Sequence, residues 1–308
     1  MREFNINFKK TFKPILIVYA VIFIAGIIMS VIAGVNLDIN FKGGTKISYS
    51  YTGDIAEKDF KAIIDEKLDK SFTISKSTAL AGDTQTYDIS LVGKDALTAG
   101  KQEELLQALE EKFADNDVKI YNSNSVSASM AGSFFIKSFV AIVITAIFVV
   151  IYVGIRFRRI GGISAALTAL VALVFDVLIV FFTCVFFRLQ IDLNFVAVVL
   201  TMLGYSLNDT IVIYDRIREN EALSPNTEIG EIVNTSINKV LIRNIVTTAT
   251  TILAVVTIIV VSEIYGLSTL RTFAIPMVFG LLSGCISSVF ISGPLWVIWK
   301  RYKEKKAA

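Results

Sequence analysis

Six long apolar stretches constrain this chain more than any other feature of its sequence. Each can cross the hydrocarbon core of a bilayer, which takes about 20 helical residues. The predicted spans are Pro14–Gly34, Phe135–Ile155, Ile160–Phe187, Leu193–Tyr214, Val240–Val261 and Thr272–Trp299. Apolar residues make up 54% of the chain and charged residues 19%, which is too little charge to cover a soluble protein of this size. The sequence therefore predicts a polytopic α-helical membrane protein with six transmembrane helices.

The first apolar stretch follows basic residues, a combination that also occurs in signal peptides. It is longer than the cleavable apolar region of a signal peptide, which has about 7–15 residues. Pro14 at its start is tolerated in the first turn of a helix. We therefore expect a cytoplasmic tail at 1–13 and an uncleaved first transmembrane helix at 14–34.

The distribution of basic residues predicts the orientation of the chain in the membrane. Lys and Arg concentrate in the two tails, in the turn after the second span and in the loop between the fourth and fifth spans. The positive-inside rule then places both termini in the cytoplasm. Segment 35–133 would lie outside, transmembrane helices 2–6 would occupy 134–299, and 300–308 would be a second cytoplasmic tail.

The segment 35–133 reads as a folded domain because its periodicity changes abruptly from that of the spans. Alternating or β-rich stretches predict strands, and apolar residues at helical spacing predict helices. The predicted strands are Leu37–Tyr51, Phe72–Leu80, Thr84–Val92 and Asp117–Val126, the helices are Glu57–Asp69 and Lys101–Ala114, and a hairpin turn is expected at Ala81-Gly82-Asp83. The order β-α-β-β-α-β is that of a ferredoxin-like α+β domain. Such a domain suits protein contact or force transmission, and its Ser/Asn run Tyr121–Ser129 is either a solvated strand and linker or a polar binding surface.

The residue types argue against metal and enzyme chemistry. The chain has no histidine, and its two cysteines, Cys184 and Cys285, lie far apart inside apolar stretches. They are typical of small core residues, so neither a disulfide nor a metal site is expected. No nucleophile–base pair or phosphate-binding loop is recognisable, so we expect no catalytic residues, no metal and no cofactor.

Ionisable residues inside membrane spans are costly and are therefore the first candidates for function. Asp176 lies near the middle of the third span, Asp209 in the fourth, and Arg243 at the start of the fifth. Counted from the cytoplasmic side, Asp209 and Arg243 reach similar depth. A carboxylate whose proton affinity is set by burial and by a nearby Arg can couple proton flow to a conformational cycle. A static pair that fixes helix register is the alternative, and Asp176 has either a functional or a structural role.

Polar neighbours extend these candidates into a path through the bundle. Tyr205, Ser206 and Asn208 precede Asp209 in the fourth span, and Thr247 and Thr248 follow Arg243 in the fifth. Helices lined in this way face the protein interior or a water-filled path. The sixth span carries a face of small residues that allows close helix packing: Gly280, Ser283, Gly284, Ser287 and Ser288.

Two motifs resemble a known family. The segment 203–219, LGYSLNDTIVIYDRIRE, closely resembles the fourth-span signature of SecF members of the SecD/SecF family of protein-export membrane proteins. Phe41-Lys42-Gly43-Gly44-Thr45 is similar to the FxGGT segment of that family, although Gly-Gly here could also be a bulge in the first strand. Asp176 and Arg243 fall where the family has an Asp and an Arg. Arg243 lies in the sequence Ile-Arg-Asn, where the family more often has Ser-Arg-Thr.

The resemblance implies a resistance-nodulation-division-like membrane fold in the bacterial cytoplasmic membrane. It implies an accessory subunit of the Sec preprotein translocase that works with SecD, beside the SecYEG channel and SecA, on the translocating preprotein. It further implies that protons are the coupling ion, that Asp209 binds them, and that Arg243 is its partner at an interface with SecD. No contact with nucleic acid is expected.

Alternative functions remain at this point. One is a self-contained proton-driven exporter of small molecules from the same superfamily; another is a passive membrane scaffold that docks partners through segment 35–133. The loop 226–238 carries Ile229, Ile232, Val233 and Ile237 at near-helical spacing. It could lie on the membrane or against a partner, and we favour an amphipathic helix on the membrane surface.

Overall fold

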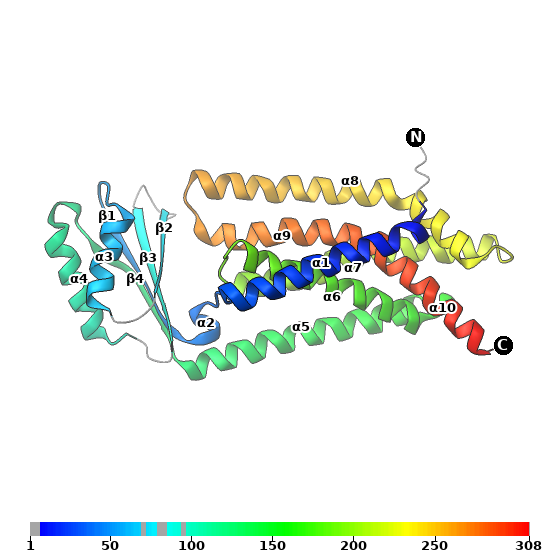
Figure 1. The fold of residues 1–308 in the computed structure, drawn as a ribbon, viewed down its shortest axis with the longest axis horizontal. Helices are drawn as coiled ribbons and strands as arrows, with labels where there is room; N and C mark the ends of the chain where they lie inside the picture. The colour runs from blue at the N-terminus through cyan, green and yellow to red at the C-terminus, as the bar shows by residue number, and fades with distance from the viewer. Residues whose placement is uncertain (1–6, 69–71, 79–84, 94–96, 308) are drawn as a thin grey trace.

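A computed structural model of the chain describes residues 7–68, 72–78, 85–93 and 97–307. The predicted hairpin turn at 81–83 and the start of the N-terminal tail lie outside the described residues. A bundle of long helices forms most of the molecule, and a small sheet with two helices sits at one end of it (Figure 1).

The prediction of six membrane-spanning helices is confirmed: within the described residues, six helical segments are long and apolar enough to cross a membrane. They are α1 (Phe8–Ala33), α5 (Ala128–Arg156), α6 (Gly162–Phe186), α7 (Leu193–Leu223), α8 (Ile229–Ile264) and a last segment in which α9 (Ser268–Ser287) continues through the π-helical turn η3 (Ser288–Ser292) into α10 (Gly293–Ala307). A short 3₁₀ turn, η2 (Arg158–Ile160), joins α5 to α6.

The six segments differ in how they are buried. Helices α1 and α5 expose large apolar side chains such as Ile17 and Phe148, which are 63% and 67% exposed, as lipid-facing helices do. Most of α6 and of the last segment is buried, and both pack against α7. The core of the bundle therefore consists of α6, α7 and α9–η3–α10, with α8 along one side (Figure 1).

The expectation for segment 226–238 is wrong: residues from Ile229 onward are the first turns of α8, continuous with the fifth span. Ile232, Val233 and Ile237 are buried. Val233 and Ile237 face α10, where a Cβ on Gly293 would lie 3.0 Å from Ile237 and 3.5 Å from Val233. The helical spacing seen in the sequence thus serves packing within this chain.

The small domain at the end of the bundle contains four antiparallel strands in the order β2-β3-β1-β4. Its elements are β1 (Gly44–Tyr51), α3 (Glu57–Lys67), β2 (Thr73–Thr78), β3 (Gln85–Val92), α4 (Ala99–Lys112), the 3₁₀ turn η1 (Ala114–Asn116) and β4 (Lys119–Val126). Alternate residues of β1 and β3, among them Tyr49 and Tyr87, form an apolar core with α3 and α4. The residues between them, such as Lys46 and Asp88, lie on the opposite face of the sheet.

The first strand begins later than predicted. Residues 39–42 form a helical turn, α2 (Ile39–Lys42), whose N-cap Asp38 accepts a hydrogen bond from the Asn40 amide at 3.3 Å. Gly43 and Gly44 then adopt φ values of +82° and +138°, which favour glycine, and a Cβ on Gly44 would lie 2.0 Å from the Leu91 carbonyl oxygen.

The other members of the FKGGT segment fasten this corner of the small domain. The Thr45 hydroxyl accepts a hydrogen bond of 2.8 Å from the Leu97 amide, and Phe41 packs edge-on against Phe135 of α5. The two glycines permit a tight turn ahead of β1 and do not form a bulge; the irregularity in β1 pairing lies at Ser48–Tyr49.

The linker between α1 and β1 is tied to the loop between α6 and α7. Leu37 and Ile191 form a parallel bridge, with the Asp38 amide donating to the Ile191 carbonyl at 3.0 Å and the Ile191 amide donating to Asn36 at 2.8 Å. Arg188 adds hydrogen bonds to the carbonyls of Ala33 and Gly34, the latter at 3.1 Å. The small domain is therefore connected to the bundle core by more than the two chain segments that lead into it.

Candidate functional site

Asp176 lies in the middle of the bundle and is 1% exposed. Its carboxylate accepts three hydroxyl hydrogen bonds, from Ser206 at 2.6 Å, Ser283 at 2.6 Å and Ser287 at 3.0 Å. The Tyr19 hydroxyl of α1 is hydrogen-bonded to the Ser283 hydroxyl at 3.0 Å. Side chains from α7 and α9 thus meet at the carboxylate on α6, and α1 joins the cluster through Ser283. The carboxylate oxygens are satisfied without a cation.

A line of buried hydroxyl groups continues from this carboxylate along α7 and η3. Thr210 donates to the Ser288 hydroxyl at 3.0 Å. Further along, the Tyr214 hydroxyl is hydrogen-bonded to Ser292 and to Thr168, both at 2.7 Å. The groups on α7 recur every four residues, which places them on one face of that helix. The interface between α6, α7 and the last span is therefore polar along much of its length.

Two glycines allow the helices to approach closely enough for these bonds. A Cβ on Gly284 would lie 3.2 Å from Ser206, and one on Gly280 would lie 2.8 Å from Val180. Small residues serve this purpose in membrane proteins, where no water drives helices together. The small-residue face of the sixth span is thus the surface that brings Ser283 and Ser287 to Asp176.

Asp209 has a different environment from Asp176. It is 2% exposed, and its Oδ2 atom is buried without a hydrogen-bond partner in the described part of the chain. Arg243 of α8 acts on this carboxylate electrostatically. Both residues are described, yet no nitrogen–oxygen pair within 4.0 Å joins them. The guanidinium group is exposed on the side of the bundle.

The predicted polar path divides between the interior and the surface. Thr248 is buried and its hydroxyl has no hydrogen-bond partner among the described residues. Tyr205 is partly buried and donates to Thr251 at 3.1 Å, which links α7 to α8. Asn208 and Thr247 are exposed, and the Thr247 hydroxyl bonds to the backbone of its own helix at 2.9 Å. Ser206 is buried but belongs to the Asp176 cluster.

Three further side chains belong to the site: two serines whose hydrogen bonds the sequence did not reveal, and an asparagine of the polar face expected in the fifth span. Ser283 and Ser287 were expected only to pack, whereas both donate to Asp176. Asn244 of α8 is 1% exposed, and its Nδ2 atom is a buried donor with no partner in the described chain. The spacing of Ser283 and Ser287, one helical turn apart in a span, was the available signal for their shared hydrogen-bonding role.

Comparison with known proteins places this arrangement in a family. Residues 106–302 match the family described as "Protein export membrane protein SecD/SecF, C-terminal". The protein translocase subunit SecF of Alicyclobacillus acidocaldarius is 32% identical over 287 residues, covering 92% of this chain and 89% of the relative. The chain belongs to the SecD/SecF family.

Other SecD/SecF members show how the chain relates to longer proteins. The translocase subunit SecDF of Bacillus subtilis is 31% identical and covers 97% of this chain, but only 39% of its own length is matched. The crystal structure of SecDF from Thermus thermophilus, described as a translocon-associated membrane protein, has a TM-score of 0.80 at 24% identity and shows the same fold across 97% of this chain.

Membership in the SecD/SecF family makes this chain a multi-pass membrane protein of protein export. The curated relatives are named as protein translocase subunits and not as enzymes. Within the described residues no group of three or more His, Cys, Asp or Glu side chains could hold a metal ion.

Proposed function

We propose that this chain is the accessory subunit of the Sec preprotein translocase that works with SecD to draw on the proton-motive force during late steps of export. The observation that carries the proposal is Asp209, a buried carboxylate in a span. One of its oxygens has no hydrogen-bond partner among the described residues, and the charged Arg243 lies nearby without forming an ion pair with it. A carboxylate whose hydrogen bonds are incomplete is free to gain and lose a proton as its surroundings change.

The surface between α7 and α8 supports SecD as the partner. Asn208, Arg243 and Thr247 are exposed there at the level of the spans. Exposing an Arg and amide groups to lipid is costly, so helices of another subunit are expected to cover them. The SecDF relative joins further sequence to a region like this chain, which spans 39% of it. A separate SecD would supply that remainder.

The coupling follows from the charge of one carboxyl group. A proton that enters from outside binds Asp209 and removes its attraction for Arg243, so α7 and α8 settle in a new register; release to the cytoplasm restores the attraction. Each proton moving inward releases about 2.3 kcal/mol per 100 mV of membrane potential. Protons are the coupling ion in this mechanism, and it uses no cofactor.

Ser206 provides the route from Asp209 to the rest of the chain. It lies one helical turn before Asp209 on α7 and donates to Asp176 on α6. The loop that joins α6 to α7 is hydrogen-bonded to the linker of the small domain. A shift of α7 would therefore move the small domain relative to the membrane, and Asp176 would act as the fixed contact between the helices.

The small domain fits a place outside the cytoplasm. Its strand order and the two helices on one face agree with a ferredoxin-like arrangement. The positive-inside rule favours both termini in the cytoplasm of a bacterial cell, with this domain on the far side. There it would act beside SecYEG on preprotein that SecA has pushed through the channel.

The test compares Asp209→Asn with Asp215→Asn in cells and in vesicles that contain the partner subunits. Asp215 lies on the same helix and pairs with Arg156 and Arg218 at 3.0 and 2.9 Å, so it controls for loss of a carboxylate on α7. Asp209→Asn should abolish stimulation of export by the proton-motive force while insertion and copurification with SecD remain. Full stimulation in Asp209→Asn at normal expression would disprove the coupling role.

A further inference from the structure

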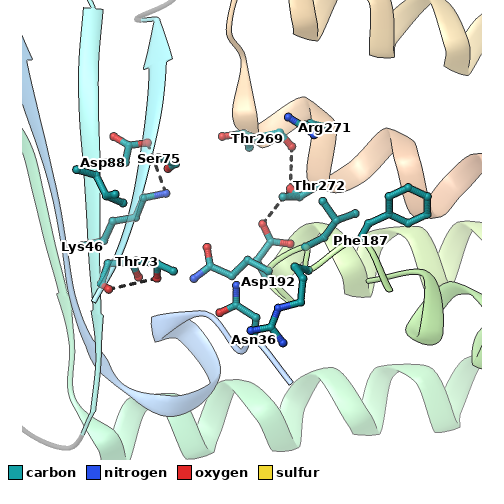
Figure 2. Close-up of a pocket in the computed structure, with 15 residues that line it drawn as sticks. Asn36, Lys46, Thr73, Ser75, Asp88, Phe187, Asp192, Thr269, Arg271 and Thr272 are labelled. Atoms are coloured by element: carbon teal, nitrogen blue, oxygen red, sulfur yellow. Dashed lines mark hydrogen bonds and ion pairs between the residues drawn. The ribbon is translucent and has the colours of Figure 1, made fainter. Parts of the chain in front are cut away.

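A polar cleft separates the small domain from the end of the helix bundle. It comprises two adjoining cavities of about 310 and about 630 Å³, and both are lined by Lys46 and Asp88 of the sheet and by Gln190 and Asp192 of the α6–α7 loop. Figure 2 shows the sheet on one side of the space and Asp192, Thr269 and Thr272 on the other. The cleft thus lies where the bundle meets the small domain, at the predicted outer surface of the membrane.

Uncharged hydroxyl and amide side chains form the largest group in the lining. The charged residues partly offset one another: Lys46 lies 3.9 Å from Asp88, and Arg271 pairs with Glu263 at 3.4 Å. A wall of this kind offers hydrogen bonds without selecting for charge or for large apolar side chains. It suits a ligand whose constant feature is its peptide backbone.

One wall of the cleft is an edge strand. Among the described strands β2 pairs only with β3, so its other edge carries unpaired backbone amides and carbonyls. The consecutive residues Thr73, Ile74 and Ser75 of this strand line the cleft, which places the strand backbone at its wall. Free strand edges bind extended peptides through main-chain hydrogen bonds, largely independently of sequence.

Two buried polar atoms on opposite sides of the cleft, one on the sheet and one on the α6–α7 loop, lack partners within the described chain. They are Oγ of Ser90, a residue that is 5% exposed, and Nε2 of Gln190. Leaving a buried donor unpaired is energetically unfavourable. A chain bound in the cleft would supply hydrogen-bond partners to both groups after small rotations of the Ser90 and Gln190 side chains.

We propose that this cleft binds a segment of translocating preprotein in extended conformation, held by main-chain hydrogen bonds to the edge of β2. The inference rests on the proposed function, because that function brings an unfolded chain past this surface. A preprotein segment has variable side chains and a constant backbone, and the cleft offers it a free strand edge and a polar lining in which uncharged side chains predominate. Movement of the small domain would then act directly on the bound segment.

The test places the photocrosslinker p-benzoylphenylalanine at Ser75, in the full chain with its partner subunits and a preprotein arrested during export. The matched control carries the crosslinker at Glu111, an exposed position on α4, which covers the other face of the sheet. A crosslink to preprotein from position 75, absent at position 111 and lost once export is completed, is the expected result. No crosslink from position 75, or one to the partner subunit whether or not preprotein is present, would overturn the inference.

A second variant separates this inference from the proposed function. Ser75→Trp should fill the cleft and slow export, whereas Glu111→Trp should not. If Ser75→Trp exports normally while Asp209→Asn has lost its response to the proton-motive force, the cleft inference fails alone. If Asp209→Asn responds fully while position 75 crosslinks to preprotein, the coupling function fails and the binding site remains.

Discussion

Ser206 of α7 donates a hydrogen bond of 2.6 Å to the carboxylate of Asp176 on α6. Ser206 itself lies three residues before Asp209 on α7. The two aspartates of the bundle are therefore not equivalent. Asp176 has three hydroxyl partners, whereas Asp209 has an oxygen with none in the described chain. Under the proposed function, Asp176 stays in place, Asp209 gains and loses a proton, and Ser206 connects the two.

The first prediction concerns the hydroxyl donors to Asp176. Ser283→Ala removes one hydrogen bond to a buried carboxylate and should lower the free energy of unfolding by about 1.5–3 kcal/mol. Thermal unfolding of the purified protein in detergent measures the loss. Thr257→Ala is the control, because Thr257 is exposed and, within the described part of the chain, its hydroxyl bonds only to the Leu253 carbonyl of its own helix.

A double-mutant cycle makes this prediction specific. In an Asp176→Asn background the carboxylate that accepts the Ser283 hydrogen bond is absent. Ser283→Ala should therefore lower the free energy of unfolding by less than it does in the native protein. Equal losses in both backgrounds would mean that the serine contributes only packing.

The second prediction concerns the turn ahead of β1. Gly44→Ala should lower stability by at least about 2 kcal/mol, because the residue has a φ of +138° and its new Cβ would meet the Leu91 carbonyl at 2.0 Å. Gly100→Ala is the matched control: it lies in α4 with open space around it, and alanine there should be neutral or stabilising by up to about 1 kcal/mol. Protease resistance of the small domain in the full chain reports both changes, and a Gly44→Ala protein as resistant as the native one would refute the strain.

Hydropathy was enough to predict the bundle, but not its internal contacts. Six apolar stretches and the charges inside them single out Asp176 and Asp209 from the sequence alone. The partners of Asp176 depend on how α9 lies against α6 and α7, which the close contacts at Gly280 and Gly284 determine. Serines in a span have the same appearance in a sequence whether they pack or donate, so the role of Ser283 and Ser287 needed tertiary structure.

The two errors in the predicted elements have related causes. Periodicity describes a face of an element but not what covers it. The apolar face of residues 229–237 suits a membrane surface as well as the α10 surface that it actually packs against. The alternation through 37–51 continues across Gly43 and Gly44, where backbone torsions and the Asp38 cap break the strand.

The third prediction contrasts two buried tyrosines of the small domain. The Tyr49 hydroxyl has no partner in the described chain, whereas the Tyr87 hydroxyl donates to the Ile55 carbonyl at 2.8 Å. Tyr49→Phe should therefore raise the stability of this domain by about 1 kcal/mol, and Tyr87→Phe should lower it by about as much. Hydrogen exchange of β1 and β3 in the full chain measures both, and a loss of protection in Tyr49→Phe would show that its hydroxyl has a partner.

The same tyrosines predict an alkaline loss of stability. Burial raises the pKa of Tyr87 to about 12 and raises that of Tyr49 as well. The unfolded chain therefore loses these protons first, and stability falls as pH rises above the ordinary value of about 10. Tyr49→Phe should make the fall in stability between pH 10 and 12 less steep. Below pH 9 the variant should differ from the native protein only by the pH-independent gain in stability predicted above. An unchanged slope would show that Tyr49 does not contribute.

The last prediction tests the connection between the bundle and the small domain. Arg188 has a φ of +54°, and its guanidinium group bonds to the carbonyls of Ala33 and Gly34. Arg188→Gly keeps a backbone that suits this conformation but removes the link, so it separates the link from local strain. Amide exchange at Asp38 and Ile191, the donors of the parallel bridge, should rise, while the helices of the bundle keep their protection.

Measuring export distinguishes a mechanical role for the Arg188 link from a merely structural one. If the link transmits movement of α6 and α7, Arg188→Gly should reduce stimulation of export by the proton-motive force even though Asp209 and Arg243 are intact. Lys112→Ala is the control, because Lys112 is an exposed cation on α4, which covers the face of the sheet away from the cleft. Normal stimulation in Arg188→Gly, together with faster exchange at Asp38, would mean that the bridge holds the domain without driving it.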